Sequence, residues 1–421
     1  MSMDPIDATQ GLPIYCRAAV AWEPSEPLSI ETVEVGVPRQ GEVRVKILHT
    51  GVCHADSNAL EGLDPDRVFP CILGHEGAGI VESVGPKVTG FKNGDHVIPL
   101  STPQCKECRY CKNPRTNLCS KFRTTQERGL MPDGTTRFMC QGHRLYHFMG
   151  ISTFSEYTVV SENSLCKINM AAPLDKVWLL ACPVARGYGA AMNAVKITKE
   201  SRVGIWGLGA AGLSVAMGAK ERGAKTIIGV DTNESKFPRA KEFGCTECVN
   251  PNTLPKPVAQ YMAEKMNGGL DITFECIGNV HTMREAFESS HDGWGKSIIL
   301  GATPTGNLLS TLPAHLAAGR TWRGCVFGGW KSVDQVPHLA DLCLSKKLKL
   351  DELITHRLHL ERINDAFTLM QSASAASSVF NGVFFESHRH TVSSDRRDVS
   401  KMPLVIKEVN ASRRVVRCPE R

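Results

Sequence analysis

The sequence predicts an α/β protein in which a mainly β region precedes a doubly wound parallel sheet, and three observations support this. Val, Gly and turn residues dominate the chain up to about residue 180. From about residue 184, short apolar runs alternate with helical patterns, as they do in parallel sheets. A Gly-x-Gly-x-x-Gly spacing joins the first of these runs to a helix, which indicates a nucleotide-binding turn.

In the first region, the clearest element is the run at residues 42–48, where apolar and polar residues alternate with period two. This period is typical of a half-buried strand. Shorter apolar runs at residues 20–22, 80–84 and 96–98 are separated by Gly and Pro. We therefore expect these runs to be short strands as well.

In the second region, each apolar run is bounded by a helical segment. We expect strands at residues 202–206, 226–231, 271–276 and 296–300. A helical stretch follows the second strand, and an amphipathic helix is expected at residues 333–346.

The length of 421 residues (46.0 kDa) favours two or three domains. We predict a catalytic domain at 1–183, a coenzyme domain at 184–326, a return to the catalytic domain at 327–386 and a mobile tail at 387–421. The net charge is +6, but the tail alone carries nine Lys or Arg against four Asp or Glu. The near-neutral body therefore suggests no polyanion partner, and we expect no nucleic-acid binding.

Sixteen cysteines without an apolar leader segment predict a reducing compartment, and we expect a cytoplasmic protein. The apolar, uncharged run at residues 203–219 is shorter than the ~20 residues of a membrane helix. We therefore expect no membrane association.

Four cysteines lie close together in a single segment: Cys105, Cys108, Cys111 and Cys119. Four thiolates can surround one zinc ion and leave no open position, which is the pattern of a structural site. Chance clustering and disulfide pairing are the alternatives. Disulfides are disfavoured in a reducing compartment.

Three further candidate ligands are dispersed: Cys53, His75 and Cys182. Two Cys and one His leave a fourth zinc position for water or substrate, which is the catalytic pattern. Each of these residues alone is more often part of a core. Their occurrence together, beside a four-cysteine segment and a nucleotide-binding motif, favours a second zinc ion.

The glycine motif consists of Gly207, Gly209 and Gly212. The first glycine permits a tight turn, the second lets a pyrophosphate approach the backbone, and the third lets helix and strand pack closely. Asp231, at the end of the next strand, would bind the ribose hydroxyls and repel a 2′-phosphate. The motif therefore predicts NAD rather than NADP, with Lys236 as a further coenzyme-binding candidate. A purely structural glycine turn is the alternative.

The chain resembles the zinc-containing medium-chain alcohol dehydrogenases, and most of all their class III type, the glutathione-dependent formaldehyde dehydrogenases. The resemblance runs from about Cys16 to about Ser372. It implies a GroES-like catalytic domain and a Rossmann coenzyme domain. The motifs that carry it lie at residues 74–79, 104–119, 129–134, 152–157, 274–279 and 327–331.

The resemblance also implies roles for individual residues. The three dispersed ligands would hold the catalytic zinc, and Asp56 would orient the imidazole of His75. Glu76 would be a second supporting group beside the zinc, and His54 would face the coenzyme pyrophosphate. For the glutathionyl substrate, the matching positions are Asp64 or Asp66 and Arg123. A solvated surface charge is the alternative for each of these three.

The sequence departs from the family pattern at several site positions. Ala55 stands where the family has Thr or Ser, whose hydroxyl passes the substrate proton toward the coenzyme ribose. Arg186 stands where a small residue lies by the nicotinamide, and Pro183 replaces a glycine. Residues 374–378 contain no arginine to grip the pyrophosphate, and Ser377 is its closest counterpart.

Two hypotheses of different classes follow. The first is an NAD-dependent enzyme that oxidises S-(hydroxymethyl)glutathione and primary alcohols, with two zinc ions per chain. The second is a catalytically weak zinc- and NAD-binding protein that serves as a scaffold or sensor. The two intact ligand sets favour the enzyme. The resemblance also implies a homodimer.

Overall fold

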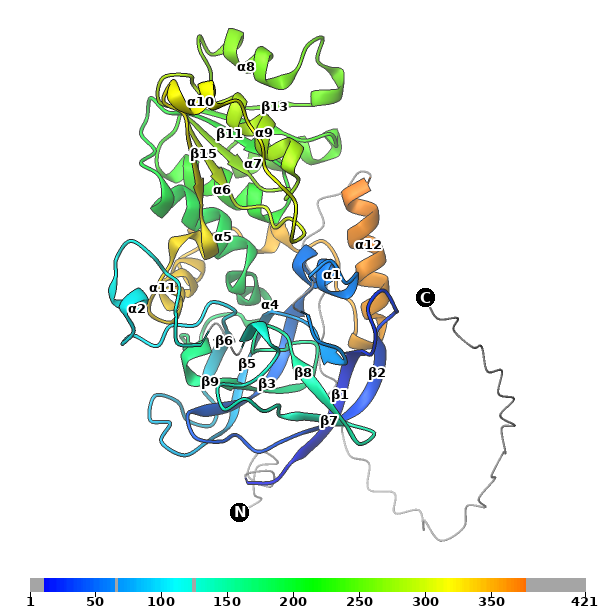
Figure 1. Cartoon of the computed structure of the whole chain (residues 1–421). Coiled ribbons are helices and arrows are strands. Elements are labelled where there is room, and N and C mark those ends of the chain that lie inside the picture. The colour runs from blue at the N-terminus through cyan, green and yellow to red at the C-terminus, as the bar shows by residue number, and fades with distance from the viewer. Residues whose placement is uncertain (1–10, 65–66, 123–125, 376–421) are drawn as a thin grey trace, which may run out of the picture. The chain divides into compact units, whose positions relative to one another are not determined.

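The computed structural model describes residues 11–64, 67–122 and 126–375, with side chains as far as residue 370 (Figure 1). The predicted tail at 387–421 therefore lies outside the described residues. The described chain contains a mostly antiparallel barrel, in which only β4 and β8 pair in parallel, an antiparallel sheet and a parallel sheet. The predicted α/β class is confirmed.

The first β assembly is a closed barrel in the order β1-β2-β7-β8-β4. Its interior is apolar, and Val33, Phe138 and Leu145 are fully buried. The strands are β1 (Ile14–Ala21), β2 (Ser29–Val35), β4 (Cys71–Ile72), β7 (Phe138–Cys140) and β8 (His143–His147).

The second β assembly is a five-stranded sheet in the order β10-β6-β5-β3-β9. Strand β3, which lies between β5 and β9, contains the alternating run predicted at 42–48. The strands are β3 (Glu42–Gly51), β5 (Glu76–Val84), β6 (His96–Pro99), β9 (Tyr157–Ser161) and β10 (Leu165–Lys167). Short helices interrupt this region, among them α1 (His54–Leu60), α2 (Arg109–Lys112) and α4 (Leu174–Val177).

The parallel sheet has six strands in the order β13-β12-β11-β14-β15-β16. Four were predicted: β11 (Arg202–Trp206), β12 (Thr226–Val230), β14 (Ile272–Glu275) and β15 (Lys296–Ile299). The sequence analysis missed β13 (Glu247–Val249) and β16 (Thr321–Gly324). Both form an edge of the sheet and lack an apolar run, since edge strands are buried less completely than central ones.

One helix precedes the first parallel strand, and five helices connect the strands that follow in the described chain. They are α5 (Pro183–Gly189), α6 (Ala210–Glu221), α7 (Phe237–Phe243), α8 (Val258–Lys265), α9 (Val280–Glu288) and α10 (Pro313–Ala317). Helix α6 is rich in small residues because α5 packs closely against it. A Cβ atom on Gly187 of α5 would lie 2.0 Å from the carbonyl oxygen of Ala211.

After the parallel sheet, the chain adds α11 (Ser332–Leu344) and α12 (Ile363–Ala375). Helix α11 matches the helix predicted at 333–346. Figure 1 shows the orange α12 beside the blue β1 and β2, and Asn364 exchanges two hydrogen bonds with the backbone of Leu28 between those strands. The exact domain limits proposed at 183/184 and 326/327 remain predictions.

Short helical turns complete the described structure. They are η2 (Glu162–Ser164), η3 (Trp178–Ala181), η4 (Ala190–Ala194), η5 (Glu234–Lys236), η6 (Pro251–Thr253), η7 (Val326–Gly329), η8 (Asp351–Leu353) and η9 (Leu360–Arg362). Among the described helices, none combines the length and apolar character that crossing a bilayer requires.

Candidate active site

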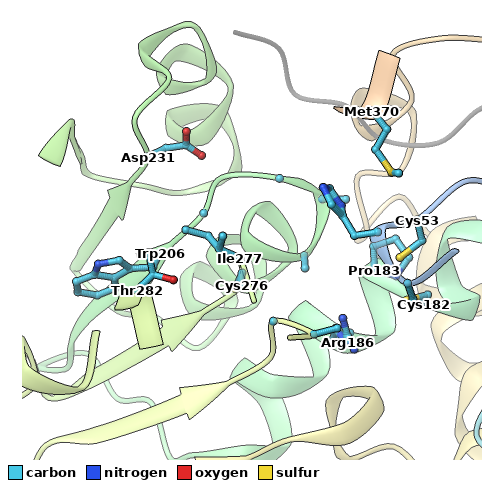
Figure 2. Close-up of a pocket in the computed structure, with 18 of the residues that line it drawn as sticks. Cys53, Cys182, Pro183, Arg186, Trp206, Asp231, Cys276, Ile277, Thr282 and Met370 are labelled. Atoms are coloured by element: carbon cyan, nitrogen blue, oxygen red, sulfur yellow. The ribbon is translucent and has the colours of Figure 1, made fainter. Parts of the chain in front are cut away.

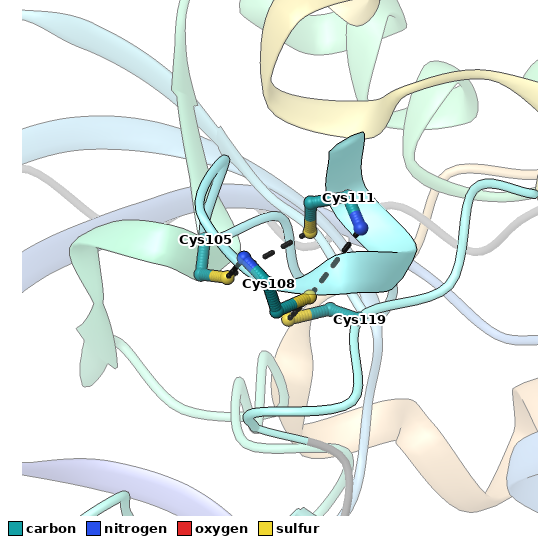
Figure 3. A group of neighbouring side chains, drawn as sticks. All are labelled: Cys105, Cys108, Cys111 and Cys119. Carbon is teal, nitrogen blue, oxygen red and sulfur yellow. Dashed lines mark hydrogen bonds between the residues drawn. The ribbon is translucent and has the colours of Figure 1, made fainter. Parts of the chain in front are cut away.

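The four cysteines of residues 105–119 converge in space, and we call them the four-cysteine cluster (Figure 3). Their sulfur atoms all lie within 4.8 Å of one another. Cys105 and Cys111 are 3.8 Å apart, and Cys108 and Cys119 are 4.0 Å apart. Four sulfurs at ~2.3 Å from one zinc ion would be ~3.8 Å apart, so the cluster fits a tetrahedral zinc site.

Backbone amides favour a thiolate at Cys108, whereas burial raises the pKa of Cys111 to about 12 and also raises the pKa of Cys119. The amides of Cys108 and Cys111 donate to the sulfurs of Cys105 and Cys108, each at 3.3 Å. Burial raises the pKa of Cys108, but the Cys111 amide and Ser120 outweigh it and lower that pKa to about 5. A thiolate is the form that binds a metal.

The four-cysteine loop is held by a segment far along the chain. Lys331 donates from Nζ to the carbonyl oxygens of Tyr110, Cys111 and Asn113 at 2.7–3.1 Å. The neighbouring Trp330 donates from Nε1 to the carbonyl of Ala185, in α5, at 3.0 Å. One short segment therefore contacts both the cysteine loop and α5.

The dispersed candidate ligands also converge. Cys53, His75, Glu76 and Cys182, which we call the Cys-His-Glu cluster, offer ligand atoms within 4.8 Å of one another. They come from the residue before α1, the loop before β5, the start of β5 and the residue before α5. Figure 2 shows Cys53 and Cys182 close to each other at one end of a pocket. Sulfur and imidazole donors suit zinc, so this donor set fits the predicted ion.

Asp56 organises this cluster from behind. Its carboxylate accepts from the Cys53 amide at 2.9 Å and from the Gly74 amide at 3.1 Å. Its Oδ1 also lies 3.1 Å from Nδ1 of His75. Because Nδ1 is engaged, Nε2 is left to face the cluster, which is the arrangement expected of a metal-binding imidazole.

Glu76 is the fourth member of the cluster, with Oε1 at 3.8 Å from Nε2 of His75. Burial and the neighbouring Cys53 raise the pKa of Glu76 well above its usual range. Gly51 makes room for this carboxylate, because a Cβ atom there would lie 2.7 Å from Oε2. A cation in the cluster would relieve the cost of burying this charge.

The glycine motif forms the turn from β11 into α6. Gly207 has a φ of +89°, which favours glycine, and a Cβ atom on Gly212 would lie 1.8 Å from the Gly207 carbonyl oxygen. No atom lies within 4 Å of the Cβ position of Gly209, the residue that precedes α6. The start of the helix is therefore open to a phosphate group.

One cavity of about 310 Å³ reaches from the Cys-His-Glu cluster to the glycine motif. Asp231, Lys236 and His54 line it (Figure 2 labels Asp231). Burial lowers the pKa of His54, and the nearby charge of Lys236 lowers it further. Groups that could contact a metal, a pyrophosphate and a ribose thus face the same space.

The structure adds a detail at Asp231 that the sequence did not reveal. One carboxylate oxygen accepts from the Leu208 amide at 2.8 Å and pairs with Nζ of Lys236 at 3.0 Å. The other accepts from the Asn233 amide at 2.9 Å. A lysine therefore offsets part of the negative charge that would discriminate against a 2′-phosphate.

The predicted substrate residues are only partly described. Asp66 and Arg123 lie outside the described residues. Asp64 is paired with Arg67 at 2.7 Å, and the Arg67 guanidinium lies 4.5 Å from the centre of the Phe148 ring. The sequence analysis missed Arg67, because nothing in its local pattern distinguishes it from a surface arginine.

Three of the residues that depart from the family pattern face the same cavity, and the fourth, Ser377, lies outside the described residues. Ala55, Pro183 and Arg186 all line it, and Arg186 lies near Cys182 in Figure 2. Cys276 and Met370 also line the cavity, and the sequence analysis did not select them as site residues. The position of Cys276 directly after a parallel strand was the available signal, because ligands bind beyond the carboxyl ends of such strands.

A metal-fitting cluster and a nucleotide-fitting turn on one cavity define a metal-dependent dehydrogenase. The alcohol dehydrogenase GroES-like domain matches residues 39–170, and the zinc-binding dehydrogenase domain matches residues 210–344. The chain is 56% identical over 378 residues to "Alcohol dehydrogenase class-3" of Caenorhabditis elegans, covering 89% of this chain and 98% of that protein. It is 53% identical over 369 residues to the protein of the same name from Myxine glutinosa, covering 88% and 98%.

Two solved structures of similar fold support the same family. An alcohol dehydrogenase zinc-binding domain protein from Burkholderia ambifaria has a TM-score of 0.81 at 31% identity, covering 89% of this chain and 99% of the other. Benzyl alcohol dehydrogenase from Acinetobacter calcoaceticus has a TM-score of 0.80 at 29% identity, with the same coverage. The chain therefore belongs to the zinc-containing alcohol dehydrogenase family and, within it, to class III. This confirms the predicted resemblance, fold and cofactors, zinc and NAD.

Proposed function

We propose that this protein oxidises S-(hydroxymethyl)glutathione, and also primary alcohols, with NAD as hydride acceptor. The observation that carries the proposal is the single cavity that joins the Cys-His-Glu cluster to the glycine motif. The similarity to proteins named class-3 alcohol dehydrogenase supports the choice of substrate.

Cys53, His75 and Cys182 would hold the catalytic zinc, and Glu76 would stay beside it. Zinc, when bound, polarises the substrate oxygen, and the substrate hydride passes to the nicotinamide. Asp56 would keep the imidazole of His75 oriented toward the metal through the contact with Nδ1. The four-cysteine cluster would hold a second, structural zinc ion.

The coenzyme would bind along the glycine motif. Gly207, Gly209 and Gly212 would receive the pyrophosphate at the start of α6, where backbone amides favour an anion. Asp231 would accept a hydrogen bond from a ribose hydroxyl. Lys236 would stay near it, and His54 would approach the pyrophosphate from the catalytic side.

For the glutathionyl group we propose Arg123 as the partner of a carboxylate and Asp64 or Asp66 as partners of an ammonium group. The ion pair of Asp64 with Arg67 competes with a substrate contact, so Asp66 becomes the stronger candidate of the two acids.

We also propose a cytoplasmic homodimer without a nucleic-acid or membrane partner. All cysteines within the described residues are free thiols, which supports a reducing compartment. Strand β16 is an edge of the parallel sheet, and edge strands tend to pair with another chain. Exposed apolar side chains lie before and after this strand: Leu308, Leu312, Leu316 and Val326.

The test combines elemental analysis with an assay of NADH formation from formaldehyde and glutathione, using the full chain. Two zinc ions per chain and NADH formation are expected. Cys182→Ser should lose the activity and one zinc ion. Zinc and NAD binding without turnover on any alcohol would favour the scaffold or sensor hypothesis instead.

Substrate recognition is tested separately with Arg123→Ala. We expect a raised KM for S-(hydroxymethyl)glutathione and a smaller effect on long-chain alcohols. An equal loss on both substrates would show that Arg123 is structural.

A further inference from the structure

Arg186 is an unusual residue for the wall of this cavity. It lies in α5, one helical turn after Cys182, and its amide bonds to the Cys182 carbonyl at 2.9 Å. Its side chain lines the cavity together with Cys53 and Cys276, which Figure 2 labels, and with Glu76. A guanidinium group therefore stands between the Cys-His-Glu cluster and the carboxyl end of β14.

No described residue pairs with this guanidinium, although it is half-buried. The two fully enclosed arginines of the described chain are treated differently. Arg44 is paired with Glu82 through two hydrogen bonds, and Arg137 is paired with Glu42 through two more. Burying an unpaired charge is costly, and arginine does not escape the cost by losing its proton.

Glu76 lines the same cavity and offsets part of this charge, but the zinc site supplies no hydrogen-bonded partner. The charges of two cysteine thiolates are balanced by one Zn²⁺ ion, and a metal-bound His75 is neutral. Glu76 lies within the cluster, 3.8 Å from the His75 ring, and makes no ion pair with Arg186 in the described structure. The guanidinium group of Arg186 thus faces the cavity without a hydrogen-bonded partner, on the same wall as Cys182.

We infer that this pocket is a carboxylate subsite, in which Arg186 binds small alcohols that carry a carboxylate on the carbinol carbon. The planar guanidinium group suits a carboxylate because both oxygens can be bound at once. This deepens the proposed function, because it uses the same zinc and NAD chemistry. The hydride leaves the carbinol carbon for NAD, the hydroxyl proton leaves to water, and the 2-hydroxy acid becomes a 2-oxo acid.

This subsite differs from the one proposed for Arg123. The carboxylates of a glutathionyl group lie many bonds away from the reacting carbon, whereas Arg186 follows a zinc ligand by one helical turn. The two arginines would therefore select for anionic groups at different distances from the chemistry.

The test measures binding of glycolate to the zinc-loaded full chain with NADH present, so that no turnover occurs. Glycolamide, the neutral counterpart of glycolate, is the matched ligand. We expect glycolate to bind at least tenfold more tightly than glycolamide, as measured by calorimetry. Arg186→Gln should weaken glycolate binding about 10- to 100-fold and leave glycolamide unchanged, since a charged hydrogen-bonded pair is lost.

Two variants serve as controls. Arg186→Lys keeps the charge but loses the two-pronged geometry, so an intermediate affinity is expected. Arg39→Gln removes an exposed arginine of the β region, paired with Asp133, and should change nothing. Equal binding of the two ligands by the unmodified protein would overturn the inference. A preference for glycolate that survives in Arg186→Gln would also overturn it, because the carboxylate would then be bound by the metal.

The outcome is separable from that of the proposed function. If S-(hydroxymethyl)glutathione is not oxidised but Arg186 controls the glycolate preference, the substrate proposal fails and the subsite stands. If the glutathione adduct is oxidised and the preference is absent, the subsite fails and the substrate proposal stands.

Discussion

The two metal-fitting clusters of this protein are built in opposite ways. The four-cysteine cluster comes from one loop, residues 105–119, whose own amides donate to the sulfurs. The Cys-His-Glu cluster is gathered from three separate segments and is organised by Asp56. The four-cysteine cluster does not line the cavity, while the Cys-His-Glu cluster opens on it and shares it with the glycine motif. A contiguous site suits a stabilising role, and a dispersed one lets several elements shape the space around the metal.

The strongest test of this contrast replaces one cysteine in each cluster. Cys108→Ser should destabilise or unfold the protein, because structural zinc contributes about 10 kcal/mol or more to folding in small zinc domains. Cys182→Ser should abolish turnover while the thermal unfolding temperature stays within a few degrees of the original.

Thermal unfolding, zinc content and turnover should be measured on both variants in parallel. Cys343→Ser, a half-buried thiol in α11 outside both clusters, is the matched control. If the two cluster variants lose stability equally, the assignment of separate structural and catalytic roles is wrong.

The second test changes the residues that depart from the family pattern. Ala55 cannot pass on the proton of the substrate hydroxyl, and a positioned proton-transfer group contributes ~10²–10⁴-fold to rate. Ala55→Thr should therefore raise kcat/KM for primary alcohols, most clearly at low pH, where the hydroxyl proton is hardest to remove.

The double variant with Ala55→Thr and Arg186→Thr should have a higher kcat/KM for neutral alcohols than either single variant, because the smaller side chain leaves more space for the nicotinamide. The same change should lower kcat/KM for carboxylate-bearing alcohols. The zinc content of the four-cysteine cluster should not change in any of these variants. Ala55→Thr should be measured both in the unmodified protein and together with Arg186→Thr. If kcat/KM is unchanged in both cases while coenzyme binding is intact, the lack of a hydroxyl at residue 55 does not limit proton transfer.

The sequence predicted the contiguous cluster more directly than the dispersed one, for a physical reason. Residues 105–119 carry all four ligands at spacings that a single loop can close around a metal. Cys53, His75 and Cys182 become neighbours only through the packing of α1, β5 and α5. Their association was therefore inferred from their occurrence beside the other two motifs and from the family resemblance.

Other features could not be predicted from the sequence because they depend on the direction in which side chains point. The pairing of Lys236 with Asp231 and the position of Arg67 over Phe148 cannot be read from spacing. Strands β13 and β16 were missed because edge strands do not need a continuous apolar run.

The third test concerns coenzyme choice at the far end of the cavity. Asp231→Ala should reduce the preference for NAD over NADP about 10-fold or more, because Lys236 would then be free to meet a 2′-phosphate. Lys236→Ala should increase the preference, since Asp231 would keep its full charge. Initial rates with both coenzymes give the ratio of kcat/KM. A ratio near one in the unmodified protein would contradict the role of Asp231.

The smallest expected effect lies at the support of the four-cysteine loop. Lys331→Met removes three hydrogen bonds to loop carbonyls, and we expect a loss of about 1–3 kcal/mol in the free energy of unfolding. Zinc should also leave the loop faster when a chelator is added. Lys347→Met in the turn after α11 is the control. Unchanged zinc release would show that Lys331 does not hold the loop.

The contacts of Lys331 also bear on how the chain is made. The carbonyl of Tyr110 and the lysine that binds it are 221 residues apart in sequence. During synthesis, the cysteine loop leaves the ribosome long before its support exists, and the whole parallel sheet is translated in between. The loop can bind zinc early, but it reaches its final position only after the segment that contains Lys331 has been synthesised. Nascent chains that end before residue 331 should therefore hold a zinc loop that proteases still cleave, and longer chains should protect it.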